Sequence, residues 1–293
     1  MNSDFPSLNN STLCAVIVTY HPDAGFSTRF ESLRSQINKI IVVDNGSDEQ
    51  EQKLINNLNF DNKVLVIKNH QNLGIAAALN IGVKKALEMG YLYTILFDQD
   101  SEPYSNCVAE LISTFLNIPQ QEKVAVLTCS NNQSKNKTTE IDSAQYYNAR
   151  RSITSGSLVP IYIYKKVGWF REDFFIDAVD TEFCFRARKL GYKIYKTKKI
   201  LMNHTIGNPK LHNFFGLQIK LTHHNAMRKY YMARNYLLLD RMYPEFAKGW
   251  WVKKAVMRYL EWIVCVLLYE ENKLEKIIAI TKGYKHAINS YVN

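Results

Sequence analysis

Short apolar runs alternate with amphipathic stretches along the first half of the chain. The apolar runs predict strands at residues 14–19, 39–43, 63–68, 93–97 and 123–128. The stretches between them predict helices at about 26–36, 50–58, 75–89 and 106–116. This alternation favours an α/β fold with mostly parallel strands joined by crossover helices. Near-continuous apolar strands indicate a sheet that is covered on both faces.

Polar residues follow four of the predicted strands. They are Thr19, Asp44, the stretch 69–72 and the stretch 98–101. Ligands of open α/β sheets bind beyond the carboxyl ends of the strands. We therefore predict that these four groups lie at one edge of the sheet and form a binding site.

The second half of the chain has a different pattern. Residues 131–148 are polar and predict a surface loop, and residues 180–190 predict a helix that stops at Gly191. Beyond about Gly216, helical patterns predict helices at 217–242, 248–269 and 273–291. The chain is thus predicted to comprise a catalytic domain at 1–215, with halves at about 12–130 and 150–215, and a helical region at 216–293.

Positive charge gathers in the last third of the chain. The net charge is +10, and residues 210–293 hold 14 Lys and Arg against 6 Asp and Glu. This excess is typical of a solvated helical surface, or of a face that meets anionic lipid or a diphosphate. The apolar stretch 259–269 is too short to span a bilayer, but it can lie on a membrane surface or pack on the catalytic domain. No nucleic-acid-binding motif accompanies the charge, so we expect no nucleic acid partner.

The cysteines lie far apart, without a CxxC pair or a Cys/His cluster. They are Cys14, Cys107, Cys129, Cys184 and Cys265. An odd, scattered set predicts reduced thiols, as in a cytosolic protein.

Two acidic motifs are candidates for chemistry. Asp98 and Asp100 follow a predicted strand, where one carboxylate can bind Mg²⁺ or Mn²⁺ while the other holds a sugar hydroxyl. By itself, this pair is also compatible with a simple turn. Asp180 begins a predicted helix, whose amino end tolerates a negative charge, so it is a candidate general base. It is equally explained as an N-cap.

Two further stretches suit a nucleotide. Asp44, in a turn that reads Asp-Asn-Gly-Ser, can accept the ring N–H of a pyrimidine, although an Asn-Gly turn explains it as well. Asn72 and Gly74 precede a helix whose backbone N–H groups can approach phosphate or sugar oxygens. Close packing of that helix on the sheet is the alternative.

The order of these motifs resembles glycosyltransferase family 2. The motifs are TYHPD (19–23), VVDNGS (42–47), NLGIAAALNIG (72–82), FDQDS (97–101), TSGSLVP (154–160), FIDAVDTEFCFRARKLGY (175–192) and NHTIG (203–207). FDQDS and FIDAVDTEFCFR are similar to the bacterial rhamnosyltransferase branch, whose members build O-antigen and related cell-surface polysaccharides. The resemblance covers about residues 12–239. It implies a GT-A fold and an inverting mechanism.

The resemblance also implies roles for individual residues. Asp100 and His204 match the metal-binding positions, and Asp180 matches the general base, with Asp177 as the second choice. The positions that match nucleotide-sugar-binding residues are Thr19, Tyr20, Asp44, Asn72, Gly74, Asp98, Gln99, Ser155, Gly156, Arg228 and Arg234. One departure is that the base motif reads Val-Asp instead of the common Glu-Asp, which leaves the choice between Asp177 and Asp180 open.

The expected reaction is transfer of L-rhamnose from dTDP-β-L-rhamnose to a sugar hydroxyl. The expected acceptor is a lipid-diphosphate-linked oligosaccharide at the cytoplasmic face of the membrane, which the basic C-terminal helices would contact. A UDP-sugar donor is the alternative within the family. Rival classes are a metal-dependent phosphatase and a non-catalytic nucleotide-binding protein. A dinucleotide-dependent dehydrogenase is disfavoured, because the turn after the first strand lacks the glycine fingerprint.

Overall fold

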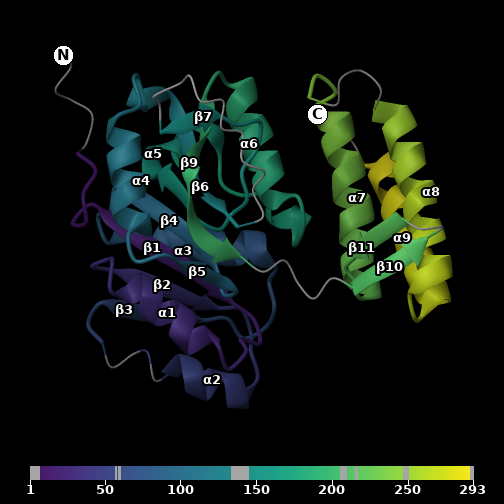
Figure 1. Cartoon of the computed structure of the whole chain (residues 1–293), viewed down its shortest axis with the longest axis horizontal. Helices are drawn as coiled ribbons and strands as arrows, with labels where there is room; N and C mark the ends of the chain where they lie inside the picture. Colours follow the sequence, from purple (N-terminus) through teal and green to yellow (C-terminus); the bar gives the residue numbers. More distant parts are fainter. Residues whose placement is uncertain are drawn as a thin grey trace. The chain divides into compact units, whose positions relative to one another are not determined.

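The chain folds into two compact units (Figure 1). The computed structural model describes residues 7–56, 58, 61–132, 145–204, 210–214, 217–246 and 251–290, with only the backbone described at 210–214 and 217–221. The sheet unit comprises Met1–Asp173 and Phe183–His204, and the helical unit comprises Phe174–Glu182 and Thr205–Asn293. The predicted loop at 131–148 lies mostly outside the described residues, as do residues 205–207 of the last motif.

The sheet unit is built on a nine-stranded mixed sheet, counted over the described residues. Its strands are β1 (Leu13–Thr19), β2 (Ile40–Asp44), β3 (Val64–Lys68), β4 (Tyr93–Asp98), β5 (Ser101–Pro103), β6 (Val124–Asn131), β7 (Tyr146–Asn148), β8 (Ser157–Pro160) and β9 (Lys193–His204). The strand order is β3-β2-β1-β4-β8-β6-β9-β5, and β7 pairs with β9. Strands β1 to β4 are parallel to one another, whereas β8 runs antiparallel to both of its neighbours.

Helices flank this sheet (Figure 1). They are α1 (Phe26–Arg34), α2 (Glu49–Asn56), α3 (Ile75–Glu88), α4 (Cys107–Leu116) and α5 (Ile161–Val167). Two short 3₁₀ turns lie at Gln121–Lys123 and Glu172–Phe174. Helix α6 (Val179–Lys189) contains the boundary between the two units.

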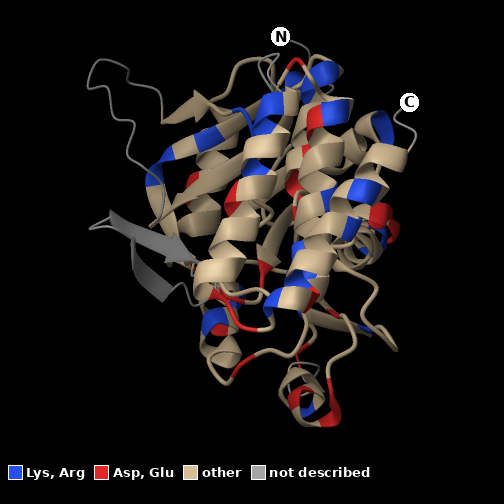
Figure 2. Ribbon diagram, turned by 90° about the vertical axis from the view of Figure 1, so that its right-hand side faces the viewer, with Lys and Arg blue, Asp and Glu red and all other residues tan. Residues whose placement is uncertain are grey.

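The helical unit contains three helices and a hairpin. Its elements are β10 (Lys210–Phe214), β11 (Leu217–Leu221), α7 (Ala226–Met242), α8 (Trp251–Tyr269) and α9 (Lys273–Asn289). Figure 2 shows Lys and Arg distributed over these helices. Among the residues described, no helix is long and apolar enough to cross a bilayer.

Helices α7 and α9 approach each other closely. A Cβ on Gly283 of α9 would lie 2.5 Å from the backbone oxygen of Tyr230 and 2.9 Å from the Cβ of Ala233, both on α7. Beside this crossing, buried Glu270 accepts hydrogen bonds from Lys229 at 2.6 Å and Lys276 at 2.9 Å. A buried carboxylate needs such partners, because an unpaired buried charge is strongly unfavourable.

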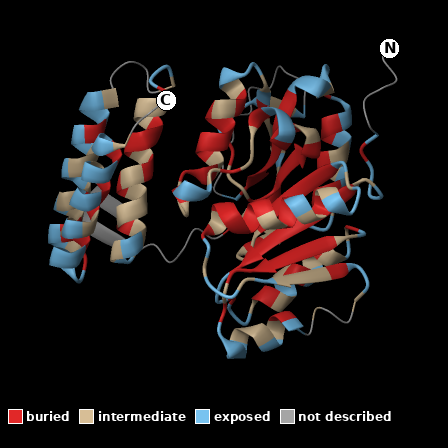
Figure 3. Ribbon diagram, turned by 180° about the vertical axis from the view of Figure 1, so that it is seen from behind, coloured by how far each residue is buried: buried red, intermediate tan, exposed pale blue. Residues whose placement is uncertain are grey.

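Figure 3 shows that the central part of the sheet is buried, and strands β1, β2 and β4, which are buried almost throughout, read as near-continuous apolar runs. Ala15 and Ile17 of β1 share one apolar cluster with Phe30 of α1. Val16 points to the opposite face, where a Cβ on Gly82 of α3 would lie 2.4 Å from its side chain. Helix α3 therefore rests directly on the sheet, as its run of small residues predicts.

The fold confirms the predicted α/β class and, within a few residues, the five predicted strands, which are β1, β2, β3, β4 and β6. Strands β5, β7, β8 and β9 were not predicted; β9 runs parallel to β6 and antiparallel to β5 and β7. The predicted helix at 217–242 is wrong at its start, because Leu217–Leu221 is a strand and α7 begins at Ala226. Apolar residues alternate with polar ones in Leu217–Leu221, which is the period of a strand. The Asn225 side chain then caps α7 by accepting a hydrogen bond from the backbone N–H of Arg228 at 2.9 Å.

Candidate functional site

The parallel strands bring the predicted polar groups to one edge of the sheet. Thr19, at the end of β1, is in register with Asp44 at the end of β2. Val18 is in register with Asp98 at the end of β4, and Asp44 is in register with Lys68 of β3. The prediction that these strand ends converge is therefore confirmed.

Asp44 is held by a small hydrogen-bonded group. Its Oδ1 accepts hydrogen bonds from the hydroxyls of Thr19 at 3.3 Å and Ser47 at 2.5 Å. The turn between them needs Gly46, whose φ is +90° and whose Cβ would lie 2.6 Å from the backbone of Gln71. Asp44 itself is 0% exposed. A pyrimidine base can therefore contact the Asp44 carboxylate only after neighbouring side chains move.

Asn45 connects this turn to the loop before α3. Its amide donates to Asn72 Oδ1 at 2.9 Å, and its own Oδ1 accepts from the Asn69 amide at 3.0 Å and from the backbone N–H of Leu73 at 3.1 Å. Asn72 Oδ1 also accepts from the backbone N–H of Gly74 at 2.9 Å. The predicted residues Asn72 and Gly74 are thus fixed next to the Asp44 turn.

Tyr20 and Gln99 form a reciprocal pair. The backbone N–H of Tyr20 donates to Gln99 Oε1 at 2.7 Å, and the Gln99 amide donates back to the Tyr20 carbonyl at 3.0 Å. Arg29 donates to the Gln99 carbonyl at 2.9 Å. The Tyr20 side chain stays exposed, so its ring is accessible for stacking.

Asp98, Asp100 and His204 offer ligand atoms within 4.8 Å of one another. Strands β5 and β9 place Ser101 opposite His204, and the Ser101 hydroxyl lies 2.9 Å from His204 Nδ1. Asp100 Oδ1 lies 3.4 Å from the same nitrogen. Within the described part of the chain, this oxygen is buried and has no hydrogen-bond partner. Two carboxylates, one of them with an unsatisfied oxygen, and an imidazole suit a divalent cation.

Ser155 and Gly156 lie behind the acidic loop. The buried Ser155 hydroxyl is within hydrogen-bond distance of the Ser101 hydroxyl and accepts from the backbone N–H of Asp98 at 3.3 Å. Gly156 has a φ of +71°, and its Cβ would lie 2.1 Å from Cys129 Sγ. Ser155 therefore holds the loop that carries Asp98 and Ser101, whereas Gly156 contacts the neighbouring strands through Leu96 and Cys129.

The two predicted base candidates lie in the helical unit. Both oxygens of Asp177 accept hydrogen bonds from the Arg228 guanidinium, at 3.0 and 3.1 Å. Asp180 Oδ1 accepts from the backbone N–H of Thr181 at 2.6 Å and from its hydroxyl at 3.2 Å. Asp177 is therefore engaged through both of its carboxylate oxygens.

The backbone that carries Asp177 has an unusual conformation. Phe175, Asp177 and Ala178 all have a positive φ, between 56° and 65°. The Asn235 side chain of α7 donates to the carbonyls of Phe174, Ile176 and Asp177, at 2.7, 2.8 and 3.0 Å. Such conformations are costly for non-glycine residues and persist where the surroundings fix them.

Aromatic rings and charge complete this part of the helical unit. The Arg234 guanidinium lies 5.1 Å from the centre of the Tyr231 ring, which stacks on Phe175. Burial, followed by the charge of Arg228, lowers the pKa of His224 to about 4. His224 is therefore neutral at pH 7.

Comparisons with known proteins agree with this architecture. Residues 14–175, more than half of the chain, match the family described as glycosyl transferase family 2. The chain belongs to glycosyl transferase family 2. This family 2 member is 30% identical over 245 residues to the dTDP-rhamnosyl transferase RfbF of Shigella flexneri, covering 79% of this chain and 81% of the relative. The predicted family and its glycosyltransferase activity are thus confirmed.

Solved structures share the fold of this family 2 enzyme. The mannosyltransferase PcManGT of Pyrobaculum calidifontis, in complex with GDP-Man and Mn²⁺, matches with a TM-score of 0.60 and 11% identity over 95% of this chain and 87% of that chain. GalNAc-T7 with UDP, GalNAc and Mn²⁺ matches with a TM-score of 0.59 and 13% identity over 95% of this chain. This chain spans 55% of the GalNAc-T7 chain. At these identities the likeness establishes the fold.

The structure adds residues to the site of this family 2 enzyme that the sequence did not single out. Asn45, Ser47 and Ser101 lie inside recognised motifs, but their partners are distant in sequence. Ser47 sits in an Asp-Asn-Gly-Ser turn, where a hydroxyl commonly bonds back to the preceding acid. That local signal could have identified Ser47, whereas the links of Asn45 and Ser101 depend on the folded sheet.

Proposed function

We propose that this glycosyltransferase transfers L-rhamnose from dTDP-β-L-rhamnose, with inversion, to a sugar hydroxyl of a lipid-diphosphate-linked glycan. The observation that carries the proposal is the 30% identity to a dTDP-rhamnosyl transferase over four-fifths of both chains. The acidic sheet edge supports it, because carboxylates can hold a divalent cation, and a nucleoside diphosphate leaving group needs positive charge at its oxygens.

The proposed donor site lies in the sheet unit, where the ends of β1, β2 and β4 bring Thr19, Asp44 and Asp98 together. Asp98, Asp100 and His204 would hold Mg²⁺ or Mn²⁺, since their ligand atoms already lie within 4.8 Å of one another. The bound cation supplies charge that stabilises the departing diphosphate. Tyr20 would stack on the base, and the donor side would be completed by Thr19, Asp44, Asn72, Gly74 and Gln99.

The proposed general base is Asp180. Inversion needs one group that removes the proton of the acceptor hydroxyl as it attacks the sugar. Asp177 is the weaker candidate because both of its oxygens accept hydrogen bonds from Arg228. In this structure Arg228 is the ion-pair partner of Asp177. Arg228 and Arg234 are the two side-chain cations proposed to bind the diphosphate.

A donor panel tests this function. The purified full chain is incubated with Mn²⁺ or Mg²⁺, a lipid-diphosphate-linked oligosaccharide, and dTDP-rhamnose, UDP-sugars or GDP-mannose in separate reactions. We expect transfer from dTDP-rhamnose only, with an α-linked product that NMR identifies. Transfer from UDP-sugars alone would overturn the rhamnose assignment while leaving the family intact.

Helix α8 supports a membrane-bound location for this reaction. One of its faces is apolar and about half exposed, at 48–59% of each side chain. That face consists of Val252, Val256, Met257, Leu260, Val264, Leu267 and Leu268. Lys253 and Lys254 lie at the start of the same helix. An apolar face next to cations fits an anionic lipid surface, so we propose that α8 lies in the membrane interface at the cytoplasmic side.

Vesicle sedimentation tests the α8 proposal. We expect the chain to bind vesicles that contain phosphatidylglycerol and to lose most of this binding in the double variant Val256→Asp, Leu260→Asp. The control Leu116→Asp introduces one such negative charge at an exposed apolar position of α4 in the sheet unit. Equal binding by both variants would refute a lipid role for this face.

A further inference from the structure

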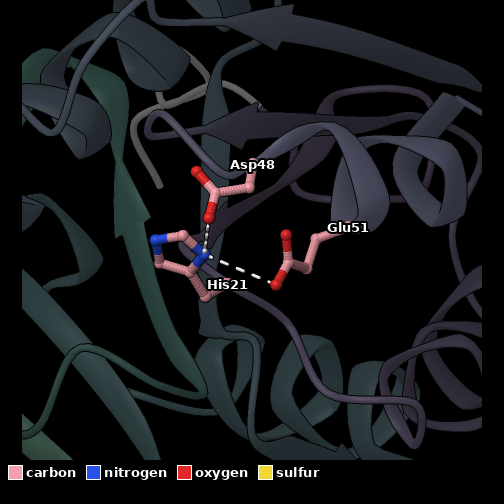
Figure 4. A group of neighbouring side chains, drawn as sticks. All are labelled: His21, Asp48 and Glu51. Atoms are coloured by element: carbon pink, nitrogen blue, oxygen red, sulfur yellow. Dashed lines mark ion pairs between the residues drawn. The ribbon is translucent and has the colours of Figure 1, made fainter.

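The sheet unit holds a second group of one histidine and two carboxylates. His21 follows β1, and Asp48 and Glu51 lie at the start of α2 (Figure 4). Their ligand atoms all lie within 4.8 Å of one another. None of the three belongs to the acidic sheet edge described above, and the proposed transfer reaction uses none of them.

The spacing of these atoms suits a shared ion better than direct hydrogen bonds. His21 Nδ1 lies 3.5 Å from Glu51 Oε1 and 3.9 Å from Asp48 Oδ2. Ligands at about 2.1 Å from one metal ion are about 3.0 to 3.4 Å apart in octahedral or tetrahedral geometry. The His21–Glu51 distance of 3.5 Å lies just above this range. Asp48 is 82% exposed, so a small rotation of its side chain brings it into range.

Two further observations are consistent with a ligand at this group. Glu51 Oε2 is buried and has no hydrogen-bond partner in the described part of the chain, although a carboxylate oxygen away from water normally has one. His21 is also fixed in position. Its φ is +48°, and its backbone N–H donates to the Ser47 hydroxyl at 3.0 Å. The imidazole is therefore presented by a restrained backbone.

We propose that His21, Asp48 and Glu51 form a second divalent cation site. One imidazole and two carboxylates favour a transition metal such as Zn²⁺, Co²⁺ or Mn²⁺, with water at the remaining positions. The bound ion joins the loop after β1 to the start of α2. Ser47 contacts both His21 and Asp44, so occupancy of this site stiffens the turn that carries Asp44.

Cobalt binding tests the site without any enzymatic assay. The full chain carries Asp100→Asn throughout, which weakens the other metal-binding group. Co²⁺ is titrated by calorimetry and by its visible absorption, which reports imidazole and carboxylate ligands. We expect one Co²⁺ per chain, and at least about tenfold weaker binding after His21→Gln or Asp48→Asn. The control Glu49→Gln removes the same charge from the same helical turn and should bind Co²⁺ like its parent.

Thermal unfolding gives a second readout. Zn²⁺ should raise the melting temperature of the Asp100→Asn chain and of its Glu49→Gln derivative, because a ligand that binds only the native state stabilises it. The increase should disappear after His21→Gln and after Asp48→Asn. Asp48 is exposed, so its variant tests the site even if the histidine variant misfolds. Co²⁺ affinity unchanged by both substitutions, or no bound Co²⁺ in the parent, would overturn the proposal.

Discussion

The two units hold their carboxylates by different means. In the sheet unit, Asp44 and Asp98 end strands whose register with β1 is set by backbone hydrogen bonds. In the helical unit, Asp177 lies in a left-handed stretch that is held by the side chains of Asn235 and Arg228. The first arrangement is a property of the sheet, whereas the second depends on two side chains of α7.

This difference teaches what a substitution can disturb. Replacing a carboxylate at the sheet edge changes the chemistry there, but the strand ladder keeps the backbone in place. Asn235 itself has no proposed role in the reaction, yet replacing it removes the hydrogen bonds that hold the backbone around Asp177. Substituting a carboxylate of the sheet unit should therefore lower activity without lowering stability. Substituting Asn235 in the helical unit should lower both.

The largest effect is expected at Asp100. Asp100→Asn removes a charged ligand from the group formed with Asp98 and His204, so kcat/KM for transfer should fall by about three orders of magnitude. The melting temperature should change little, because this oxygen has no hydrogen-bond partner among the described residues. Steady-state kinetics and thermal unfolding measure both. Glu102→Gln, in the neighbouring strand β5, is the control and should retain activity.

The next effect compares Asp180 with Asp177. Asp180→Asn should lower kcat by about 10² to 10⁴, the usual contribution of a general base, and leave dTDP binding intact. Asp177→Asn should lower kcat less but destabilise the fold, because Arg228 loses its charged partner. Single-turnover rates and calorimetric dTDP affinity distinguish the two. A fully active Asp180→Asn enzyme with an inactive Asp177→Asn enzyme would exchange the two roles.

The sequence predicted the parts of the fold that local patterns encode. Strands β1, β2 and β4 are buried almost throughout, β3 is half-buried, and all four read as apolar runs, so their shared edge followed from the α/β pattern. Strand β9 was missed because its twelve residues, KIYKTKKILMNH, mix lysines with apolar positions that become buried only after pairing with β6 and β5. The hairpin of β10 and β11 was not predicted. Apolar and polar residues alternate in Leu217–Leu221, but this segment is short and lies directly before the longer helical pattern of α7.

The candidate site was predictable in its residue types and not in its connections. Asp44, Asp98 and Asp100 follow apolar strands, a local signal. The hydrogen bonds of Asn45 with Asn69 and Asn72 span more than twenty residues, and the hydrogen bond from Asn235 to the Asp177 carbonyl spans 58 residues. Such contacts depend on tertiary packing and leave no pattern in one sequence.

The third prediction concerns the hydrogen bonds from Asn235 to the backbone around Asp177. Asn235→Leu keeps the size of the side chain but removes three hydrogen bonds to backbone carbonyls and the one that Asn235 Oδ1 accepts from Arg234 at 3.0 Å. The free energy of unfolding should fall by about 1 to 3 kcal/mol, and kcat should fall by about tenfold because the segment is no longer fixed. Urea unfolding and initial rates measure these. Asn225→Asp, at the N-cap of the same helix, should change neither by much, because aspartate caps as well as asparagine.

The smallest effect concerns His224. Burial, followed by the charge of Arg228, lowers its pKa from 6.5 to about 4. As the pH falls from 6.5 to 4, the unfolded chain therefore gains a proton on this residue before the native chain does. The contribution of His224 to stability is complete above pH 6.5 and is lost through that window. The midpoint of urea unfolding should consequently fall less with acidification in His224→Gln than in the natural chain.

Glu270 adds its own pH dependence to both proteins. Burial acts to raise its pKa, but the hydrogen bonds from Lys229 and Lys276 outweigh burial and hold the pKa below its usual value. Its contribution is therefore lost only as the pH falls through that lower value, and it cancels when the two proteins are compared at each pH. Urea midpoints at pH 7, 6, 5 and 4.5 give the comparison. Parallel curves for the two proteins would mean that His224 takes up its proton equally in the native and unfolded states.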